Sequence, residues 1–120
     1  MSRNKGPGAC YVVAWPDELI LKAGVSCQRR WLSFIGYQVV LIHEAGAASY
    51  DVEAIAAGII RRHGGTNAFD TAADAIPYLA GHGGGYLECL RLPDEDAFWA
   101  AVDELRMPGA LPGALPGAIR

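Results

Sequence analysis

Short runs of apolar residues, separated by turn-forming residues, predict four β-strands along the chain. Runs of β-prone residues at 11–15 and 19–23 flank the sequence Pro-Asp-Glu, and two such runs around a turn predict a β-hairpin. A continuous apolar stretch at 37–43 predicts a buried third strand. The sequence YLECLRL at 86–92 predicts a fourth strand, far along the chain from the other three.

Apolar residues spaced three to four positions apart predict helices between and after these strands. The clearest helix is predicted over 51–63, with Ser49 or Asp51 as its N-cap and two glycines directly after it. Shorter helices are predicted at 28–35, at about 70–79 and at about 93–105. Because strands and helices are mixed without regular βαβ alternation, we expect an α+β fold.

The C-terminal segment has a different character from the rest of the chain. Residues 108–119 read PGALPGALPGAI, a four-residue repeat rich in proline and glycine. Such a repeat is typical of a segment that forms neither a helix nor a β-ladder. We therefore expect one folded domain over residues 1–106 and a disordered tail over residues 107–120.

Composition excludes several classes of protein. The chain has 120 residues, of which 52% are hydrophobic and 19% charged, as in a single globular domain with its own core. Its apolar runs are shorter than the roughly 18 residues that a membrane helix needs, and the N-terminal pattern is not that of a secretory signal. Three widely spaced cysteines without a CxxC pair favour reduced thiols over disulfides or structural zinc, so we expect a cytoplasmic protein.

Several side chains capable of phosphate chemistry follow one another in a defined order. The sequence Pro-Gly-Ala-Cys-Tyr leads into the first predicted strand and ends at Tyr11, and Lys22 lies on the second strand within Leu-Lys-Ala-Gly. The later segments contribute, in order, Arg29 and Arg30, Glu53 and Asn67. This order resembles the GIY-YIG nuclease family, whose small α+β domain cuts nucleic-acid phosphodiesters with one divalent metal ion.

The resemblance covers about residues 7–69 and implies a specific architecture. A small central three-stranded antiparallel sheet would be flanked by helices, with a C-terminal strand and helix as an extension. Ala9-Cys10-Tyr11 corresponds to the family's first motif, and Leu21-Lys22-Ala23-Gly24 corresponds to the second. Lys22 stands where the second motif has a tyrosine, as it does in some relatives that read KIG.

The family's arginine is matched by Arg30, because the aromatic Phe34 follows it at the fourth position. The segment from Gly24 to Arg30 is shorter than is usual in the family, which leaves Arg29 as an alternative. The resemblance also implies a place near the metal for His43, at the end of the third predicted strand. The candidate catalytic residues are Tyr11, Lys22, Arg30, His43, Glu53 and Asn67.

Phosphodiester hydrolysis needs an activated water, neutralisation of the phosphate charge and stabilisation of the leaving oxygen. The resemblance implies that Glu53 holds Mg²⁺ or Mn²⁺, a cation that prefers oxygen ligands and keeps several waters. Tyr11 would act as the general base, and the cation of Lys22 beside it would favour the phenolate. Arg30 would bind the phosphate, and Asn67 would orient the end of the Glu53 helix or a metal-bound water.

The distribution of charge bears on whether DNA is the substrate. The whole chain has a net charge of −3, which is unusual for a nucleic-acid-binding domain. Residues 1–67, however, contain seven Lys and Arg against five Asp and Glu, whereas residues 68–120 contain three against eight. The small positive surplus attracts DNA only weakly. We therefore expect a homodimer or a partner protein to add affinity for DNA, and no association with a membrane.

The same residues also have structural interpretations. Tyr11 could be a core tyrosine, Lys22 could be a charge that protects an edge strand, and Glu53 suits the N-terminus of a helix. Two further functions therefore stay open. The chain could be a catalytically inactive GIY-YIG-fold binding module, or an unrelated small α+β domain that binds another protein.

Overall fold

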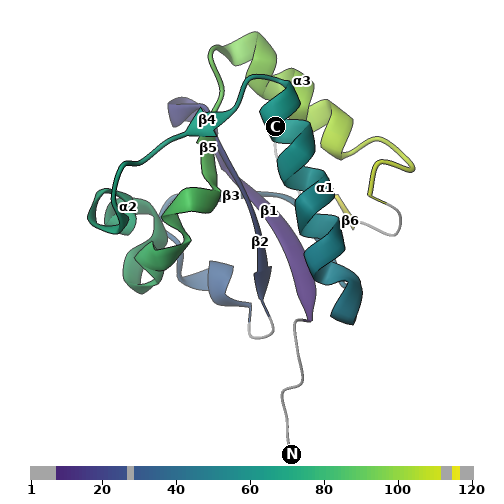
Figure 1. The fold of residues 1–120 in the computed structure, drawn as a ribbon, viewed down its shortest axis with the longest axis horizontal. Helices are drawn as coiled ribbons and strands as arrows, with labels where there is room; N and C mark the ends of the chain where they lie inside the picture. Colours follow the sequence, from purple (N-terminus) through teal and green to yellow (C-terminus); the bar gives the residue numbers. More distant parts are fainter. Residues whose placement is uncertain (1–7, 27–28, 112–114, 117–120) are drawn as a thin grey trace, which may run out of the picture.

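The computed structural model describes residues 8–26, 29–111 and 115–116. In this part of the chain six strands form one sheet in the order β4-β5-β2-β1-β3-β6, and every neighbouring pair is antiparallel (Figure 1). The strands are β1 (Ala9–Trp15), β2 (Ile20–Ser26), β3 (Gln38–His43), β4 (Thr66–Asn67), β5 (Cys89–Arg91) and β6 (Leu115–Pro116). The α-helices are α1 (Ser49–Arg62), α2 (Ala72–Leu79) and α3 (Glu95–Leu105).

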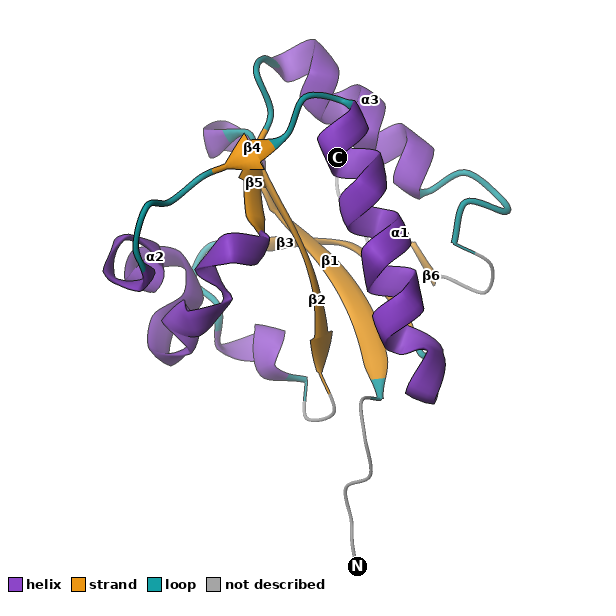
Figure 2. Ribbon diagram, viewed as in Figure 1, coloured by secondary structure: helices purple, strands orange, loops and turns teal. Residues whose placement is uncertain are grey.

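The two faces of the sheet are covered by different helices. Side chains alternate between faces along a strand, so successive residues of β1 join two separate apolar clusters. Helices α1 and α3 pack on the face that includes Val12, and α2 packs on the face that includes Tyr11 (Figure 2). Lys22 alternates with Leu21 and Ala23 on β2, and it therefore lies on the same face as Tyr11.

The hairpin predicted at the start of the chain is confirmed as β1 and β2. A 3₁₀ turn over Pro16–Glu18 joins the strands and is closed by the Leu19 N–H, which donates to the Pro16 carbonyl at 3.1 Å. The register places Tyr11 opposite Gly24 and Lys22 opposite Val13. Tyr11 and Lys22 are thus diagonal neighbours on one face, a separation that long side chains can bridge.

The prediction of a three-stranded sheet is correct for the centre and wrong for the edges. The predicted strands β2, β1 and β3 are adjacent, but β5 pairs with β2, β4 pairs with β5, and β6 pairs with β3. The predicted C-terminal strand and helix are β5 and α3, and β5 belongs to the same sheet rather than to an extension. Pairing with β5 satisfies backbone N–H and C=O groups that β2 would otherwise leave open at its outer edge.

The helix predicted at 28–35 is instead a single 3₁₀ turn, η2 (Arg30–Ser33), while residues 27–28 lie outside the described chain. After this turn Phe34 is extended and buried, and the Ile35 N–H donates to the Tyr78 carbonyl of α2. Burial of large side chains against the sheet therefore outweighs the local helical pattern. Residues 80–88 form a further 3₁₀ segment, η4 (Ala80–Glu88), which shortens the strand predicted at 86–92 to Cys89–Arg91.

The three predicted helices at 51–63, 70–79 and 93–105 are confirmed as α1, α2 and α3. Thr71 caps α2, and Asp94 caps α3 by accepting a hydrogen bond from the Ala97 N–H at 2.8 Å. The expected cap of α1 by Ser49 or Asp51 is wrong, because Ala48 is the N-cap residue and Ser49 is the buried first residue of the helix. A preceding 3₁₀ turn, Gly46–Ala48, leads directly into α1 and takes the place of a side-chain cap.

Part of the segment predicted as a disordered tail packs on the domain. Leu111 is buried in the cluster beneath α1 and α3, and β6 pairs with Leu41 and Ile42 of β3. The expectation that this repeat forms no β-ladder is therefore wrong at Leu115–Pro116. Proline is tolerated there because β6 is an edge strand, which has an unpaired side.

None of the helices in the described residues combines the length and the apolar character needed to cross a membrane.

Candidate functional site

Tyr11 and Lys22 form a buried pair on the face of the sheet that α2 covers. The Lys22 Nζ donates a hydrogen bond to the Tyr11 Oη at 2.8 Å and lies 4.9 Å from the centroid of the tyrosine ring. Only 3% of Tyr11 and 2% of Lys22 are exposed. The side chains predicted to be neighbours on the first two strands therefore contact each other directly.

Gly24 makes the space that this contact occupies. A Cβ atom on Gly24 would lie 2.4 Å from the Tyr11 Oη and 2.8 Å from the Lys22 Nζ, distances that overlap these atoms. Gly85 is nearly as close from the other side, since its Cβ would lie 3.2 Å from the Lys22 Cε. Close packing around the lysine, and not an unusual backbone angle, therefore favours glycine at position 24, whereas a Cβ at position 85 would make a tight contact.

Glu88 completes the surroundings of Lys22 and was not predicted from the sequence. Its Oε1 lies 2.6 Å from the Lys22 Nζ, and the Glu88 side chain is 45% exposed. Glu88 is the last residue of η4, immediately before Cys89 pairs with Lys22 across the β2–β5 ladder. The signal in the sequence is a single acidic residue within the apolar run YLECLRL.

Glu53 reaches the same place from α1, which packs on the opposite face of the sheet. Burial raises the pKa of Glu53 to about 7, and the charge of Glu88 and a hydrogen bond with its side chain act in the same direction, whereas Lys22 opposes them. Burial lowers the pKa of Lys22, but the charges of Tyr11 and Glu88 and its hydrogen bonds to both raise it above its usual value. Lys22 is therefore an ammonium at neutral pH, beside two carboxyl groups that compete for a proton.

These side chains meet at an open edge of the sheet. The β2–β5 ladder ends at Lys22 and Cys89, so within the described residues no strand pairs with β2 on this side after Lys22. Glu88 leaves the sheet at this point and contacts groups from both faces. The four residues Tyr11, Lys22, Glu53 and Glu88, called the edge cluster from here on, come from β1, β2, α1 and η4.

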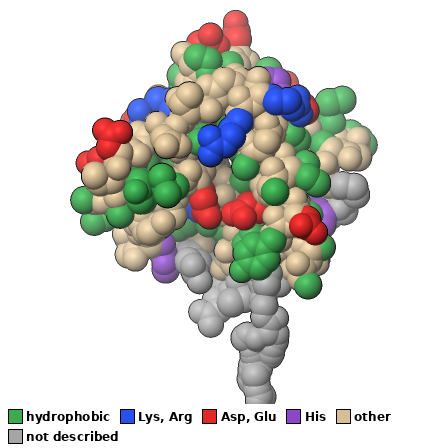
Figure 3. Space-filling model, viewed as in Figure 1, with side chains coloured by type: hydrophobic (Ala, Val, Ile, Leu, Met, Phe, Trp, Pro, Cys, Tyr) green, Lys and Arg blue, Asp and Glu red, His purple; other side chains and the backbone are tan. Residues whose placement is uncertain are grey.

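Two cavities open on the edge cluster, and Glu88 lines both of them. The tyrosine cavity, of about 200 Å³, is lined by Tyr11, Lys22, Val25, Phe34, His82, Gly84, Gly85 and Glu88. The helix cavity, of about 170 Å³, is lined by Ala23, Glu53, Ala54, Ala57, Arg61, Leu87, Glu88 and Leu90. Figure 3 shows acidic side chains gathered near the middle of the visible face, with Lys and Arg side chains above them.

Arg29, His43 and Asn67 line neither of the two cavities of the edge cluster. Asn67 is an exposed residue of β4, which is separated from β2 by β5, and it lines neither of the two cavities. His43 lies at the end of β3, beside Cys10 of β1. Arg29 pairs with Glu44 at 3.9 Å at the surface, and the side chain of Arg30 lies outside the described part of the structure.

The cysteines near the edge cluster are not activated nucleophiles. Burial raises the pKa of the Cys10 thiol to about 12, and the charges of Glu53 and Glu88 contribute in the same direction. Burial likewise raises the pKa of the Cys89 thiol to about 11. Since the thiolate is the reactive form of cysteine, both thiols are inert at neutral pH. Cys27 lies outside the described residues.

The edge cluster differs from a dedicated metal site. In the described chain no three His, Cys, Asp or Glu side chains are grouped so as to hold a metal ion. Glu53 and Glu88, however, are two adjacent carboxyl groups whose charges repel each other. A hard divalent cation that keeps most of its waters needs only one or two such ligands, so this pair fits Mg²⁺ or Mn²⁺.

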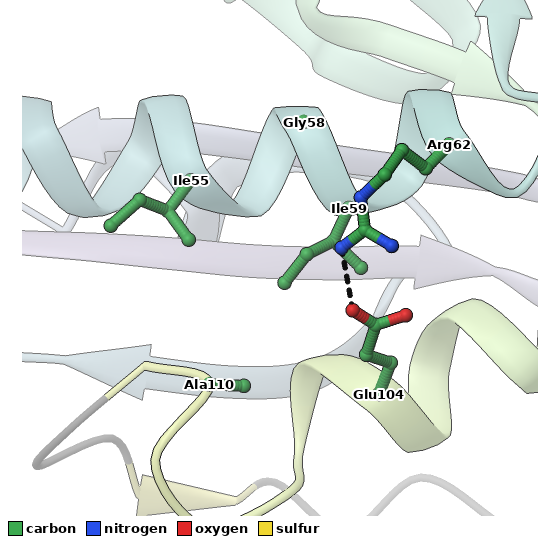
Figure 4. Close-up of a pocket in the computed structure, with 6 residues that line it drawn as sticks. All are labelled: Ile55, Gly58, Ile59, Arg62, Glu104 and Ala110. Atoms are coloured by element: carbon green, nitrogen blue, oxygen red, sulfur yellow. Dashed lines mark hydrogen bonds and ion pairs between the residues drawn. The ribbon is translucent and has the colours of Figure 1, made fainter.

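A third and larger cavity, of about 510 Å³, lies between α1, α3 and the segment after α3 and is separate from the edge cluster (Figure 4). Its polar wall is an ion pair between Arg62 and Glu104 at 2.6 Å, and His63 contacts the same carboxylate at 2.7 Å. The remaining lining is mostly apolar, including Ile55 and Ile59. This cavity contains no group suited to phosphate hydrolysis beyond the paired Arg62.

No family model, no curated protein and no solved structure matches this chain.

Proposed function

We propose that the edge cluster is the active site of a metal-dependent endonuclease that hydrolyses DNA phosphodiester bonds in the manner of the GIY-YIG family. The observation that carries this proposal is the contact between the Lys22 ammonium and the Tyr11 hydroxyl, with Glu53 and Glu88 directly beside it. Perturbed ionisable groups that converge on cavities are a frequent feature of active sites.

Tyr11 is the general base in this proposal. An ammonium in hydrogen-bond contact favours the phenolate over the phenol, and Lys22 provides that contact at 2.8 Å. Glu88 fixes the position of Lys22 through a contact of 2.6 Å. Because Tyr11 lines the tyrosine cavity, a water there can transfer a proton to the phenolate as it attacks the phosphorus.

Glu53 and Glu88 would hold the divalent cation, Mg²⁺ or Mn²⁺. Bound there, the cation would supply neutralisation of the phosphate charge and stabilisation of the leaving oxygen. Burial and the charge of Glu88 raise the pKa of Glu53, so the carboxyl partly retains its proton near neutral pH. Cation binding should therefore release a proton and weaken as the pH falls below 7.

Arg30 remains the proposed phosphate-binding arginine, with Arg29 as the alternative. Asn67 and His43 remain proposed as supporting residues, although they lie outside the two cavities of the edge cluster. The net charge of −3 supports the further proposal that a homodimer or a partner protein adds affinity for DNA.

The test is metal-dependent cleavage of supercoiled plasmid, branched DNA and single-stranded DNA. We expect nicking with Mg²⁺ or Mn²⁺, a loss of about 100-fold or more in Tyr11→Phe, and a loss at least as large in Glu53→Gln. Glu104→Gln is the matched control, because it removes a carboxylate from the ion pair between α1 and α3. Absence of metal-dependent cleavage on all three substrates, or an equal loss in Glu104→Gln, would overturn the proposal.

A second candidate function is a catalytically inactive module of the same fold that binds DNA. The observation that favours it is the burial of Tyr11 and Lys22, which leaves 3% and 2% of these residues exposed. This function predicts that the protein binds DNA, that added metal causes no cleavage, and that Tyr11→Phe leaves affinity unchanged. The third function left open by the sequence, an unrelated domain that binds another protein, predicts no DNA binding.

A further inference from the structure

Arg61 is an exposed cation at the helix cavity, the same cavity that Glu53 and Glu88 line. Among the described side chains no ion pair involves Arg61. Its neighbour Arg62 is engaged with Glu104 on α3, as Figure 4 shows. Two consecutive arginines on α1 therefore have different surroundings, and only Arg61 faces the cavity of the edge cluster.

The spacing along α1 places Arg61 at a defined distance from Glu53. Residues 53, 57 and 61 are four positions apart and lie on one side of the helix. The rise of about 1.5 Å per residue separates Glu53 and Arg61 by about 12 Å along the helix axis. This separation exceeds the rise of about 3.4 Å per nucleotide in a duplex strand. A strand whose scissile phosphate lies at Glu53 would thus place a different phosphate beside Arg61.

The walls between these two residues suit a sugar–phosphate backbone. Ala54 and Ala57 line the cavity with small side chains and leave room along the surface of α1. Leu87 lines the opposite side and is 54% exposed, so it offers an apolar surface to a sugar or a base. The carboxylates of Glu53 and Glu88 repel a phosphate chain unless a cation neutralises them. The guanidinium of Arg61 is the cationic group in the lining of this cavity, and it is suited to binding phosphate.

We propose that Arg61 binds a phosphate a few nucleotides from the scissile one in the same DNA strand, and that the helix cavity is a backbone-binding groove along α1 from Glu53 to Arg61. This inference rests on the proposed function, and it adds a substrate requirement to it. The site would recognise a strand that carries a further phosphate on one side of the cut rather than a single phosphodiester. Arg61 is a substrate-binding residue in this proposal and takes no part in proton transfer.

The test compares Arg61→Ala with Arg62→Ala, which remove the same charge from adjacent positions of one helix. Fluorescence anisotropy with a labelled single-stranded oligonucleotide in Ca²⁺ measures binding without relying on cleavage. We expect Arg61→Ala to weaken binding about tenfold and Arg62→Ala to weaken it less than twofold. The slope of log K against log salt concentration should fall by about 0.7 in Arg61→Ala. Arg61→Lys should retain that slope.

Kinetics with bis(4-nitrophenyl) phosphate, a diester without flanking phosphates, give a second measurement. Arg61→Ala should lose far more activity on the oligonucleotide than on this compound, and an equal loss on both substrates would overturn the inference. Equal binding by wild type and Arg61→Ala, equal losses in both arginine variants, or no DNA binding by the wild type would overturn the inference. If the wild type binds the oligonucleotide with the predicted arginine dependence but does not cleave it, the proposed nuclease function fails and the backbone groove stands.

Discussion

Replacement of Gly24 by alanine tests whether the Tyr11–Lys22 contact is as closely packed as the structure shows. The new Cβ would lie 2.4 Å from the Tyr11 Oη, 2.5 Å from the Tyr11 Cζ and 2.8 Å from the Lys22 Nζ. These atoms must move, because Gly24 is a buried strand residue directly opposite Tyr11. Tyr11 has little room to do so, since its ring contacts Trp31 at 5.0 Å and Phe34 at 5.9 Å between centroids.

The expected loss of stability follows from three terms. Overpacking in a core costs about 1–3 kcal/mol, and loss of a buried hydrogen bond to a charged group costs about 1.5–3 kcal/mol. Alanine also restricts the unfolded chain more than glycine does, and this stabilises the folded state by about 0.4–1 kcal/mol. The clash can be relieved either by distorted packing or by breaking the hydrogen bond, so the two costs do not add in full. We therefore expect a net loss of about 2 kcal/mol in the free energy of unfolding.

Urea unfolding followed by tryptophan fluorescence measures this change, and Trp31 reports directly on the Tyr11 ring. A slope of about 1–3 kcal/mol per molar urea converts the loss into a midpoint lower by about 1 M. Metal-dependent nicking should also fall, since the same atoms form the proposed general base. Gly58→Ala is the matched control: it lies at an exposed helical position with no atom within 4 Å of the new Cβ, and should stabilise by about 0.5–1 kcal/mol. A Gly24→Ala variant with wild-type midpoint and activity would refute the packing argument.

Three further predictions concern pH, a helix cap and the core. The pKa of Glu53 is raised to about 7 in the folded protein from 4.5, so this group stabilises the fold fully below pH 4.5, and that contribution is lost as pH rises through 7. The urea midpoint of wild type should therefore fall between pH 5.5 and 8 relative to Glu53→Gln, and parallel profiles would contradict the raised pKa of Glu53. Asp94→Ala removes the cap hydrogen bond to the Ala97 N–H and should cost about 1 kcal/mol by urea unfolding, whereas a value near zero would show that water replaces the cap. Phe98→Ala empties a fully buried position beneath α3 and should cost about 3–5 kcal/mol in the same assay, whereas a cost below 1 kcal/mol would show that the core collapses around it.

Local patterns in the sequence were sufficient for part of the fold. The hairpin of β1 and β2 and the helices α1, α2 and α3 depend on alternation, helical spacing and turn residues within a few positions of each other. The helix predicted at 28–35 failed because burial of Trp31 and Phe34 against the sheet decides the conformation there. The extra strands β4, β5 and β6 depend on partners far along the chain, which periodicity does not identify.

The candidate site could likewise be predicted only where it depends on residues close together in the sequence. The pairing of Tyr11 with Lys22 follows from a hairpin register and could be predicted. The contact of Lys22 with Glu88 joins residues 66 positions apart and exists only because β5 pairs with the outer edge of β2. Asn67 was selected by its place in a motif order, and the pairing of β4 with β5 places it beyond the two cavities.

A double-mutant cycle on cleavage tests most directly whether the edge cluster acts as one catalytic site. Single-turnover rates of plasmid nicking in Mg²⁺ would be measured for wild type, Tyr11→Phe, Glu53→Gln and the double variant. When residues act as a unit, the effects of their substitutions on the rate do not add, so the double variant should be no slower than the slower single variant. Losses that multiply in the double variant, or a wild type that does not nick DNA, would contradict a single site built from Tyr11, Lys22, Glu53 and Glu88.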